Sequence, residues 1–203
     1  MRRGWMILIS LLAAGALATG IGHQASAQEP PAAKQAPVAK EAPVAKGLII
    51  GSDGCKMCHQ TEKSGKQYSI WAESKHAQAF AVLASDKAKE IAKAKGIADA
   101  QKAPECLVCH STRDFLGAKV ALDPKTKFTP AEGVGCEACH GAGSEYKTMS
   151  IMKDRAKSVP AGLLIPSKDT CLACHNEKSP TYKPFKFEER VAQIAHPVPK
   201  ATK

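Results

Sequence analysis

The order of apolar and polar residues along the chain predicts short helices joined by loops. In residues 65–84 the apolar side chains recur at spacings close to a helical turn; they are Tyr68, Trp71, Ala72, Ala79, Phe80 and Leu83. Residues 86–103 are rich in Ala, Lys and Glu, which favours a weakly amphipathic helix interrupted at Gly96. The pattern therefore predicts two helices in the first half of the chain.

The second half carries shorter helical patterns and one long loop. Residues 149–162 and 185–196 are further helix candidates, and Pro197 and Pro199 would end the second of them. Residues 117–135 contain two prolines and three glycines, which predicts a loop with at most a short hairpin. No alternating pattern is long enough to build a sheet. We therefore expect a mainly α fold.

The N-terminus has the pattern of a secretory signal peptide. Residues 1–3 are positively charged, residues 5–17 are apolar, and residues 25–27 (Ala-Ser-Ala) supply a cleavage pattern of small residues. We expect a signal peptide over residues 1–27. The alternative is that residues 5–22 are retained as a membrane anchor, since they are just long enough to span a bilayer.

The next segment reads as a linker and the remainder as one domain. Residues 28–46 are rich in Pro, Ala and Lys and repeat Ala-Pro-Val-Ala-Lys twice, without a periodic apolar face. This composition predicts a disordered linker, either a spacer or a simple tail. Residues 47–203 then have the size of a single domain.

Every cysteine of the chain lies in a Cys-x-x-Cys-His sequence, which occurs four times, at residues 55–59, 106–110, 136–140 and 171–175. This spacing is the attachment signature of c-type haem. The two thiols can add to the two vinyl groups of one porphyrin, and the adjacent histidine can then reach the iron. The covalent bonds would use Cys55, Cys58, Cys106, Cys109, Cys136, Cys139, Cys171 and Cys174. The proximal iron ligands of these four haems would be His59, His110, His140 and His175.

Two other kinds of site use cysteines at such spacings. Zinc ribbons and fingers contain Cys-x-x-Cys pairs, and eight cysteines could form a disulfide framework. Neither requires a histidine directly after the second cysteine, which this chain has in all four copies. The repeated histidine therefore favours haem over both alternatives.

The haem interpretation also bears on the location and architecture of the protein. Covalent haem attachment in bacteria takes place outside the cytoplasmic membrane, which agrees with the signal peptide and predicts a periplasmic protein. Four haems in residues 47–203 leave roughly forty residues per haem, too few to bury each porphyrin in a thick protein core. We therefore expect short helices and loops wrapped around four closely packed haems.

The net charge changes the picture less than it first suggests. The chain carries +10, and loss of Arg2 and Arg3 with the signal peptide lowers this to +8. Haem propionates and ferric porphyrins would leave about +4 in the oxidised protein. A nucleic-acid binder would have clustered arginines interleaved with aromatic residues, whereas lysines dominate here and are scattered. We expect no nucleic-acid binding, and redox partner proteins with acidic docking faces.

A count of histidines limits the sixth ligands of the irons. Of seven histidines, four are proximal ligands and His23 lies in the signal peptide. Only His76 and His196 remain as distal ligands, so at most two haems can have two histidines within a monomer.

Methionine is the other common distal ligand of c-type haem. Met57 lies inside an attachment loop, which makes it a poor candidate. Met149 or Met152 could cap one further haem, but on a helix they share a face and are unsuited to serve two irons. At least one haem is then without a strong protein ligand, unless a lysine or a histidine of a neighbouring molecule fills the position.

The chain resembles the tetrahaem cytochrome c-554 family, which accepts electrons in bacterial hydroxylamine oxidation and includes wider electron carriers. The resemblance rests on the four motifs in order, residues 71–77 after the first motif, residues 133–143 around the third, and residues 185–191 leading to His196. It covers most of residues 52–196. It implies a mainly α fold in which the haems form closely stacked pairs.

The resemblance also implies a set of distal ligands. His76 would cap the third haem, bound through His140, and His196 would cap the fourth, bound through His175. The family has a histidine shortly after the third motif that caps the first haem, and this chain has Tyr146, Met149 and Met152 in that region instead. The second haem of the family, which corresponds to His110, has no distal protein ligand and is high-spin.

These observations predict a periplasmic electron-transfer protein, a carrier rather than an enzyme, that is a monomer or weak oligomer. It would contact a membrane only if its N-terminal segment stayed uncleaved. The alternative is a small haem reductase, in which an open iron at the His110 haem would reduce nitric oxide or another small oxide. No proton donor is evident beside that iron, since Arg113 and Asp114 are near it only in sequence. A polymeric haem wire is a third possibility, although no histidine remains to bridge subunits.

Overall fold

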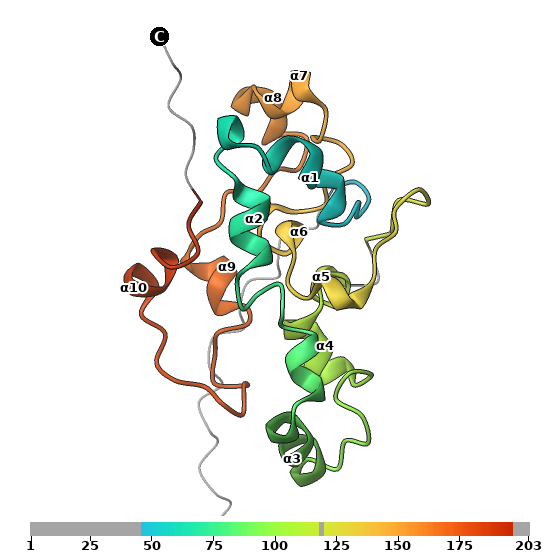
Figure 1. Ribbon diagram of the computed structural model, residues 1–203, viewed down its shortest axis with the longest axis vertical. Coiled ribbons are helices and arrows are strands. Elements are labelled where there is room, and N and C mark those ends of the chain that lie inside the picture. Colours follow the sequence, from blue (N-terminus) through green and yellow to red (C-terminus); the bar gives the residue numbers. More distant parts are fainter. Residues whose placement is uncertain (1–45, 118–119, 197–203) are drawn as a thin grey trace, which may run out of the picture. The chain divides into compact units, whose positions relative to one another are not determined.

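The computed structural model describes residues 46–117 and 120–196, and in these residues the chain forms short helices without a β-strand (Figure 1). The prediction of a mainly α fold is confirmed. The expected signal peptide and all but the last residue of the linker lie outside the described residues. None of the described helices has both the length and the apolar character needed to cross a membrane.

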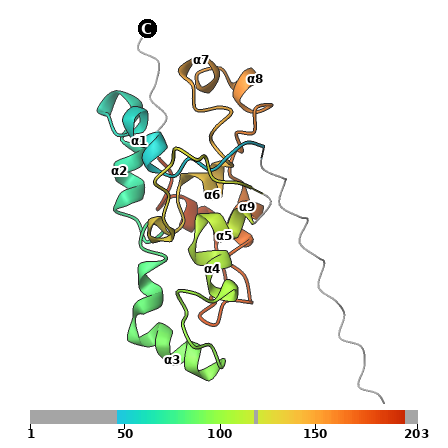
Figure 2. The same ribbon diagram turned by 90° about the vertical axis from the view of Figure 1, so that its right-hand side faces the viewer.

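The described helices are all between three and nine residues long. The α-helices are α1 (Asp53–His59), α2 (Gln67–Ala72), α3 (Asp86–Ala94), α4 (Pro104–His110), α5 (Thr112–Leu116), α6 (Cys136–His140), α7 (Met149–Met152), α8 (Arg155–Ser158), α9 (Lys168–Leu172) and α10 (Phe187–Val191). The 3-10 helices are η1 (Glu62–Ser64), η2 (Ala81–Ala84) and η3 (Pro130–Glu132). Helices α4 and α5 lie side by side, and α5 also contacts α6 and η3 (Figures 1 and 2).

The helix predicted over residues 65–84 is interrupted. Helix α2 ends at Ala72, and turns follow as far as η2. The interruption lies where the chain is held by tertiary hydrogen bonds: Trp71 Nε1 donates to Val134 O at 2.8 Å, and Val134 N donates to His76 O at 2.9 Å. The carbonyl of His76 is thus used by a distant segment. Local helix propensity predicted a single helix here and was wrong because long-range bonds took its place.

The other predicted helices are also shorter than their patterns. Helix α3 ends before Gly96, which has φ +70° and breaks the helix as predicted. The pattern over residues 149–162 gives two helices, α7 and α8, because the Asp154 side chain accepts the N–H of Ala156 at 3.0 Å and starts a new helix. The pattern over residues 185–196 gives only α10, followed by turns.

The protein's own hydrophobic clusters are small. One contains the buried residues Ile49, Val120 and Ala142 with Leu116, Leu122 and Phe128 around them. The other contains Leu83, Ala92 and Ala100, packed against Ile97, Cys106 and Leu107. The second cluster joins α3 and η2 to α4, so it supports one of the cysteine motifs. Such small clusters agree with the expectation that the polypeptide alone provides little core.

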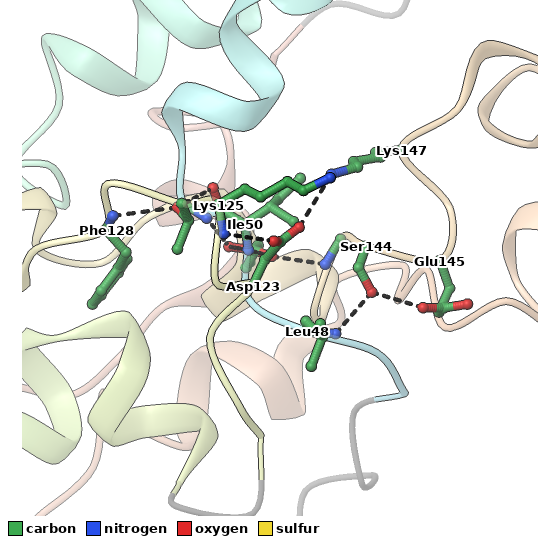
Figure 3. A network of polar contacts seen from close by, with 12 residues as sticks. Leu48, Ile50, Asp123, Lys125, Phe128, Ser144, Glu145 and Lys147 are labelled. Carbon is green, nitrogen blue, oxygen red and sulfur yellow. Dashed lines mark hydrogen bonds and ion pairs between the residues drawn. The ribbon is translucent and has the colours of Figure 1, made fainter.

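Residues 48–52 run along residues 121–126 directly before α1. Ile49 and Leu122 form an isolated parallel bridge, with Ile49 N donating to Ala121 O and Asp123 N donating to Ile49 O, both at 2.8 Å. Figure 3 shows the polar contacts of this region, which include Leu48 N to Ser144 Oγ at 2.8 Å. The segment that leads into the first motif is therefore held on both sides by distant parts of the chain.

Candidate haem-binding site

Each of the four Cys-x-x-Cys-His sequences forms a short helical turn. Helices α1, α4 and α6 contain three complete motifs, whereas α9 ends at Leu172, so that Cys174 and His175 follow it in a turn. A helical turn places residues three apart on one face, which brings the two thiols of each motif to the same side. All eight cysteines are free thiols. Both thiols of each motif are therefore available for thioether bonds.

The arrangement of the cysteines can be compared with the two alternatives. A disulfide framework is not formed, because the eight thiols are free. A structural zinc site needs four Cys or His ligands around one ion. Among the described residues no group of three or more His, Cys, Asp and Glu side chains is arranged to hold a metal ion.

The four motifs meet in two pairs through their thiols. The Cys55 thiol of the first motif lies close enough to that of Cys136 of the third to shift its pKa, and the Cys109 thiol of the second motif is likewise close to that of Cys174 of the fourth. The interaction with the partner thiol, together with burial, raises the pKa of both Cys55 and Cys174 far above the ordinary value. Burial likewise raises the pKa of Cys139 to about 11. Groups attached to the first and third motifs therefore lie close together, as do groups attached to the second and fourth.

Three of the four predicted proximal histidines are oriented by a hydrogen bond at Nδ1. The acceptor is Gln67 Oε1 at 3.3 Å for His59, Ala79 O at 2.6 Å for His110 and Leu164 O at 3.2 Å for His140. Each acceptor is an oxygen, so Nδ1 carries the proton and donates it. The Nε2 lone pair then remains free for a metal, which is the usual arrangement of metal-bound histidine.

The two predicted distal histidines each face a proximal one. The rings of His76 and His175 have centroids 6.0 Å apart, and those of His140 and His196 are 6.2 Å apart. Two imidazoles on opposite sides of one metal have their ligating nitrogens about 4 Å apart and their centroids about 6 Å apart, because each metal–nitrogen bond is about 2 Å long. Each pair is therefore spaced as two ligands of a single iron.

This pairing is the reverse of the one implied by the resemblance. The expected partners were His76 with His140 and His196 with His175, whereas the structure brings His76 to the fourth motif and His196 to the third. The position of His76 depends on its backbone, since its carbonyl accepts the N–H of Val134. These contacts join segments far apart in the chain, so motif order alone does not determine them.

Gly133 allows the close approach that holds His76 in place. Its φ is +67°, and a Cβ atom there would lie 2.6 Å from His76 O and 2.9 Å from Ala77 O. On its other side, Gly133 O accepts both the N–H and the hydroxyl of Thr112, at 2.9 and 3.0 Å. Gly133, which leads into the third motif, thus contacts both the turn at His76 and Thr112, two residues after the second motif.

The surroundings of the histidine pairs favour the protonation state that iron ligation requires. Burial lowers the pKa of His76, His140, His175 and His196, so the neutral imidazole with its free lone pair is favoured. The buried Nδ1 of His196 has no hydrogen-bond partner in residues 46–117 and 120–196, although buried polar atoms usually have one. The free thiols, oriented imidazoles and spaced ring pairs together fit haem.

Several residues that shape the site were not found from the sequence. Phe185 stacks on His175 with centroids 4.7 Å apart and an interplanar angle of 24°, and so restrains the ring of the fourth predicted proximal histidine. Gln67 orients His59 through its side chain, whereas Ala79 and Leu164 act through backbone carbonyls. A backbone acceptor leaves no signal in residue type. Phe185 did lie within a segment that carried the family resemblance, but its role was not evident.

The predicted methionine ligand is not decided by these contacts. Met149 is 62% exposed at the start of α7, and Met152 is half-buried at its end. Met57 is 81% exposed in the first motif. The choice of Met149 or Met152 as a distal ligand stays a prediction.

Comparison with known proteins agrees with this geometry. The family model for "cytochrome c554 and c-prime" matches residues 54–141, which include the first three motifs. Cytochrome c-554 of Nitrosomonas europaea is 27% identical over 176 residues, a match that covers 71% of this chain and 72% of the relative. No solved structure matches. Both similarities link the chain to the cytochrome c-554 family and support a haem c electron-transfer protein.

Proposed function

We propose that this protein is an exported carrier that passes electrons through four covalently bound haems. The proposal rests on two pairs of imidazole rings. The ring centroids of His76 and His175 are 6.0 Å apart, and those of His140 and His196 are 6.2 Å apart. Side chains from distant parts of the chain meet there at the spacing of two ligands on one iron. The haem iron supplies the redox chemistry by changing between ferric and ferrous states.

The count of four haems is supported by the equivalence of the four motifs. Each has two free thiols and a histidine directly after the second one. The thiol contacts of Cys55 with Cys136 and of Cys109 with Cys174 would place two haems side by side in each pair. Electrons would then pass between neighbouring porphyrins over a short distance.

The four irons would differ in coordination. The third haem would have His140 and His196, and the fourth would have His175 and His76. The first haem would have His59 and either Met149 or Met152. The second would have His110 with no strong protein ligand opposite it. Because methionine raises the potential of a haem relative to histidine, the first haem would lie above the third and fourth.

The protein would work in the periplasm and dock to an acidic redox partner. Export is supported by the N-terminus, where two arginines and an apolar stretch have the pattern of a signal peptide. The excess of lysine over acidic residues supports attraction to a negatively charged surface. Such attraction raises association rates and weakens as salt is added, so rates of electron exchange with an acidic partner should fall with ionic strength.

The full chain, made in a bacterium that matures c-type cytochromes, tests the proposal. Intact-protein mass spectrometry should give the mass of the processed polypeptide plus four haems, and osmotic release should recover it from the periplasm. Replacement of both Cys171 and Cys174 by Ala should remove one haem from the mass. A wild-type mass with fewer than four haems would contradict the proposal.

A further inference from the structure

Two carboxylates accept three successive backbone N–H groups just ahead of the first motif. Glu137 Oε1 accepts from Ile50 N at 2.9 Å, and its Oε2 accepts from Gly51 N at 2.8 Å. Glu132 Oε2 accepts from Ser52 N at 2.7 Å. Ile50 also lies in the polar network of Figure 3. The two carboxylates therefore hold the chain one residue before α1 begins.

Glu137 is itself part of the third motif, directly after Cys136. Glu137 is only 2% exposed. In addition to the N–H groups of Ile50 and Gly51, its carboxylate accepts a third one, from Gly143 N to Oε1 at 2.7 Å. Each of these hydrogen bonds has the carboxylate as acceptor, the arrangement that stabilises its ionised form. Burial raises the pKa of Glu137, and the three N–H donors oppose that rise. One side chain thus links the approach to the first motif with the loop that follows the third.

Glycines let these segments lie in direct contact. A Cβ atom on Gly135 would lie 2.4 Å from Ser52 Oγ, and one on Gly143 would lie 2.8 Å from Ile50 Cδ1. No side chain could therefore separate the segments at these points. Because the contact is direct, the carboxylate hydrogen bonds determine how α1 lies relative to α6. The proximity of the Cys55 and Cys136 thiols agrees with that placement.

We infer that Glu137, with Glu132 in support, positions the first and third haems relative to each other and lowers the reduction potential of both. A buried negative charge favours the ferric over the ferrous state, since the ferric haem is more positive by one charge. The Cys55 thiol is within electrostatic range of both carboxylates, so the first attachment site experiences them as the third does. This inference rests on the proposed attachment of haems to both motifs. Glu137 is a positioning residue and takes no part in ligation.

The substitution Glu137→Gln removes the charge and keeps the size of the side chain and one acceptor oxygen. In a spectroelectrochemical titration of the full holoprotein at mildly alkaline pH, two of the four potentials should move upward and two should stay in place. The third haem is identified as the one that turns high-spin in His196→Ala, and it must be among the two that move. Glu137→Asp keeps the charge, so the potentials of the first and third haems should stay close to their wild-type values.

Glu105→Gln is the matched control. Glu105 directly precedes Cys106 of the second motif, but it is exposed. This substitution should leave the potentials of the first and third haems unchanged. If Glu137→Gln moves none of the four potentials, or moves all four equally, the inference is overturned. An equal effect of Glu105→Gln on the first and third haems would overturn it as well.

A second variant keeps the test decisive if Glu137→Gln yields no holoprotein. Glu132→Gln removes the charge of the carboxylate that accepts only one of the three N–H groups, and it should move the same two potentials upward by less. Absence of that smaller shift would then overturn the inference. Haem content is measured on the same samples. Four haems without a selective shift refute the inference alone, whereas fewer than four in the wild-type protein refute the proposed function.

Discussion

Gly133→Ala should destabilise the protein and disturb the ligand of the fourth haem at once. The added Cβ would lie 2.6 Å from His76 O, closer than real Cβ contacts, and the atoms it meets are backbone. The φ of +67° costs about 1–3 kcal/mol for a non-glycine residue, and forced overpacking adds about 1–3 kcal/mol. The sum, roughly 2–6 kcal/mol, is a large part of the stability of a typical domain.

Gly96→Ala is the matched control for this substitution. Gly96 has nearly the same φ, +70°, but nothing lies within 4 Å of its Cβ position. It should therefore cost only the backbone strain of about 1–2 kcal/mol. Guanidinium unfolding of the holoproteins gives the two free energies of unfolding, and low-temperature EPR gives the spin state of each haem. The difference between the variants measures the contact with His76 together with any difference in backbone strain, since Gly133 has a ψ of −135°.

The spectroscopic result is as informative as the stability. If Gly133→Ala displaces the His76 turn, one low-spin signal should weaken in that variant and remain intact in Gly96→Ala. Equal free energies of unfolding for the two variants, with all low-spin signals unchanged, would refute the reasoning that Gly133 holds the His76 carbonyl.

Three further outcomes follow from the contacts of the site. His196→Ala should convert one low-spin haem to high-spin without loss of covalent haem, and His76→Ala should convert a different one. EPR and intact-protein mass spectrometry check both variants, and identical EPR spectra would contradict the pairing. Trp71→Phe should cost about 1 kcal/mol of unfolding free energy, because the indole bond to Val134 O is lost; an unchanged denaturation midpoint would contradict this. In the wild-type ferric protein, nitric oxide should abolish a high-spin signal from the His110 haem, whereas four low-spin signals at the outset would rule out an open iron.

The chemistry of attachment could be predicted because it is local. The two thiols and the histidine of each motif lie within five residues, and a single helical turn brings them to one side, as α1, α4 and α6 show. Helix lengths were less predictable for the opposite reason. The turn after α2 depends on Trp71 and His76 bonding to Val134, more than fifty residues away, and periodicity contains no information about that partner.

The contacts of Glu137 show the same difference between what local sequence determines and what the fold determines. Glu137 was visible from the sequence only as a residue inside a motif, and its burial on the N–H groups of Ile50 and Gly51 depends on how residues 48–52 lie against α6. Positive-φ glycines such as Gly133 were visible as loop residues. Their reason, the absence of space for a Cβ beside a distant carbonyl, emerged only with the fold.

The sequence by itself determined the identity of the cofactor, the helical class, and the shortage of distal histidines. These follow from residue types and short spacings, where covalent geometry leaves few choices. The tertiary structure decided which histidine faces which motif, and it reversed the expected pairing of His76 and His196. The physical reason is that two imidazoles about 6 Å apart must be delivered by segments from opposite parts of the chain. Their meeting depends on backbone hydrogen bonds and glycine contacts between those segments, which no local pattern encodes.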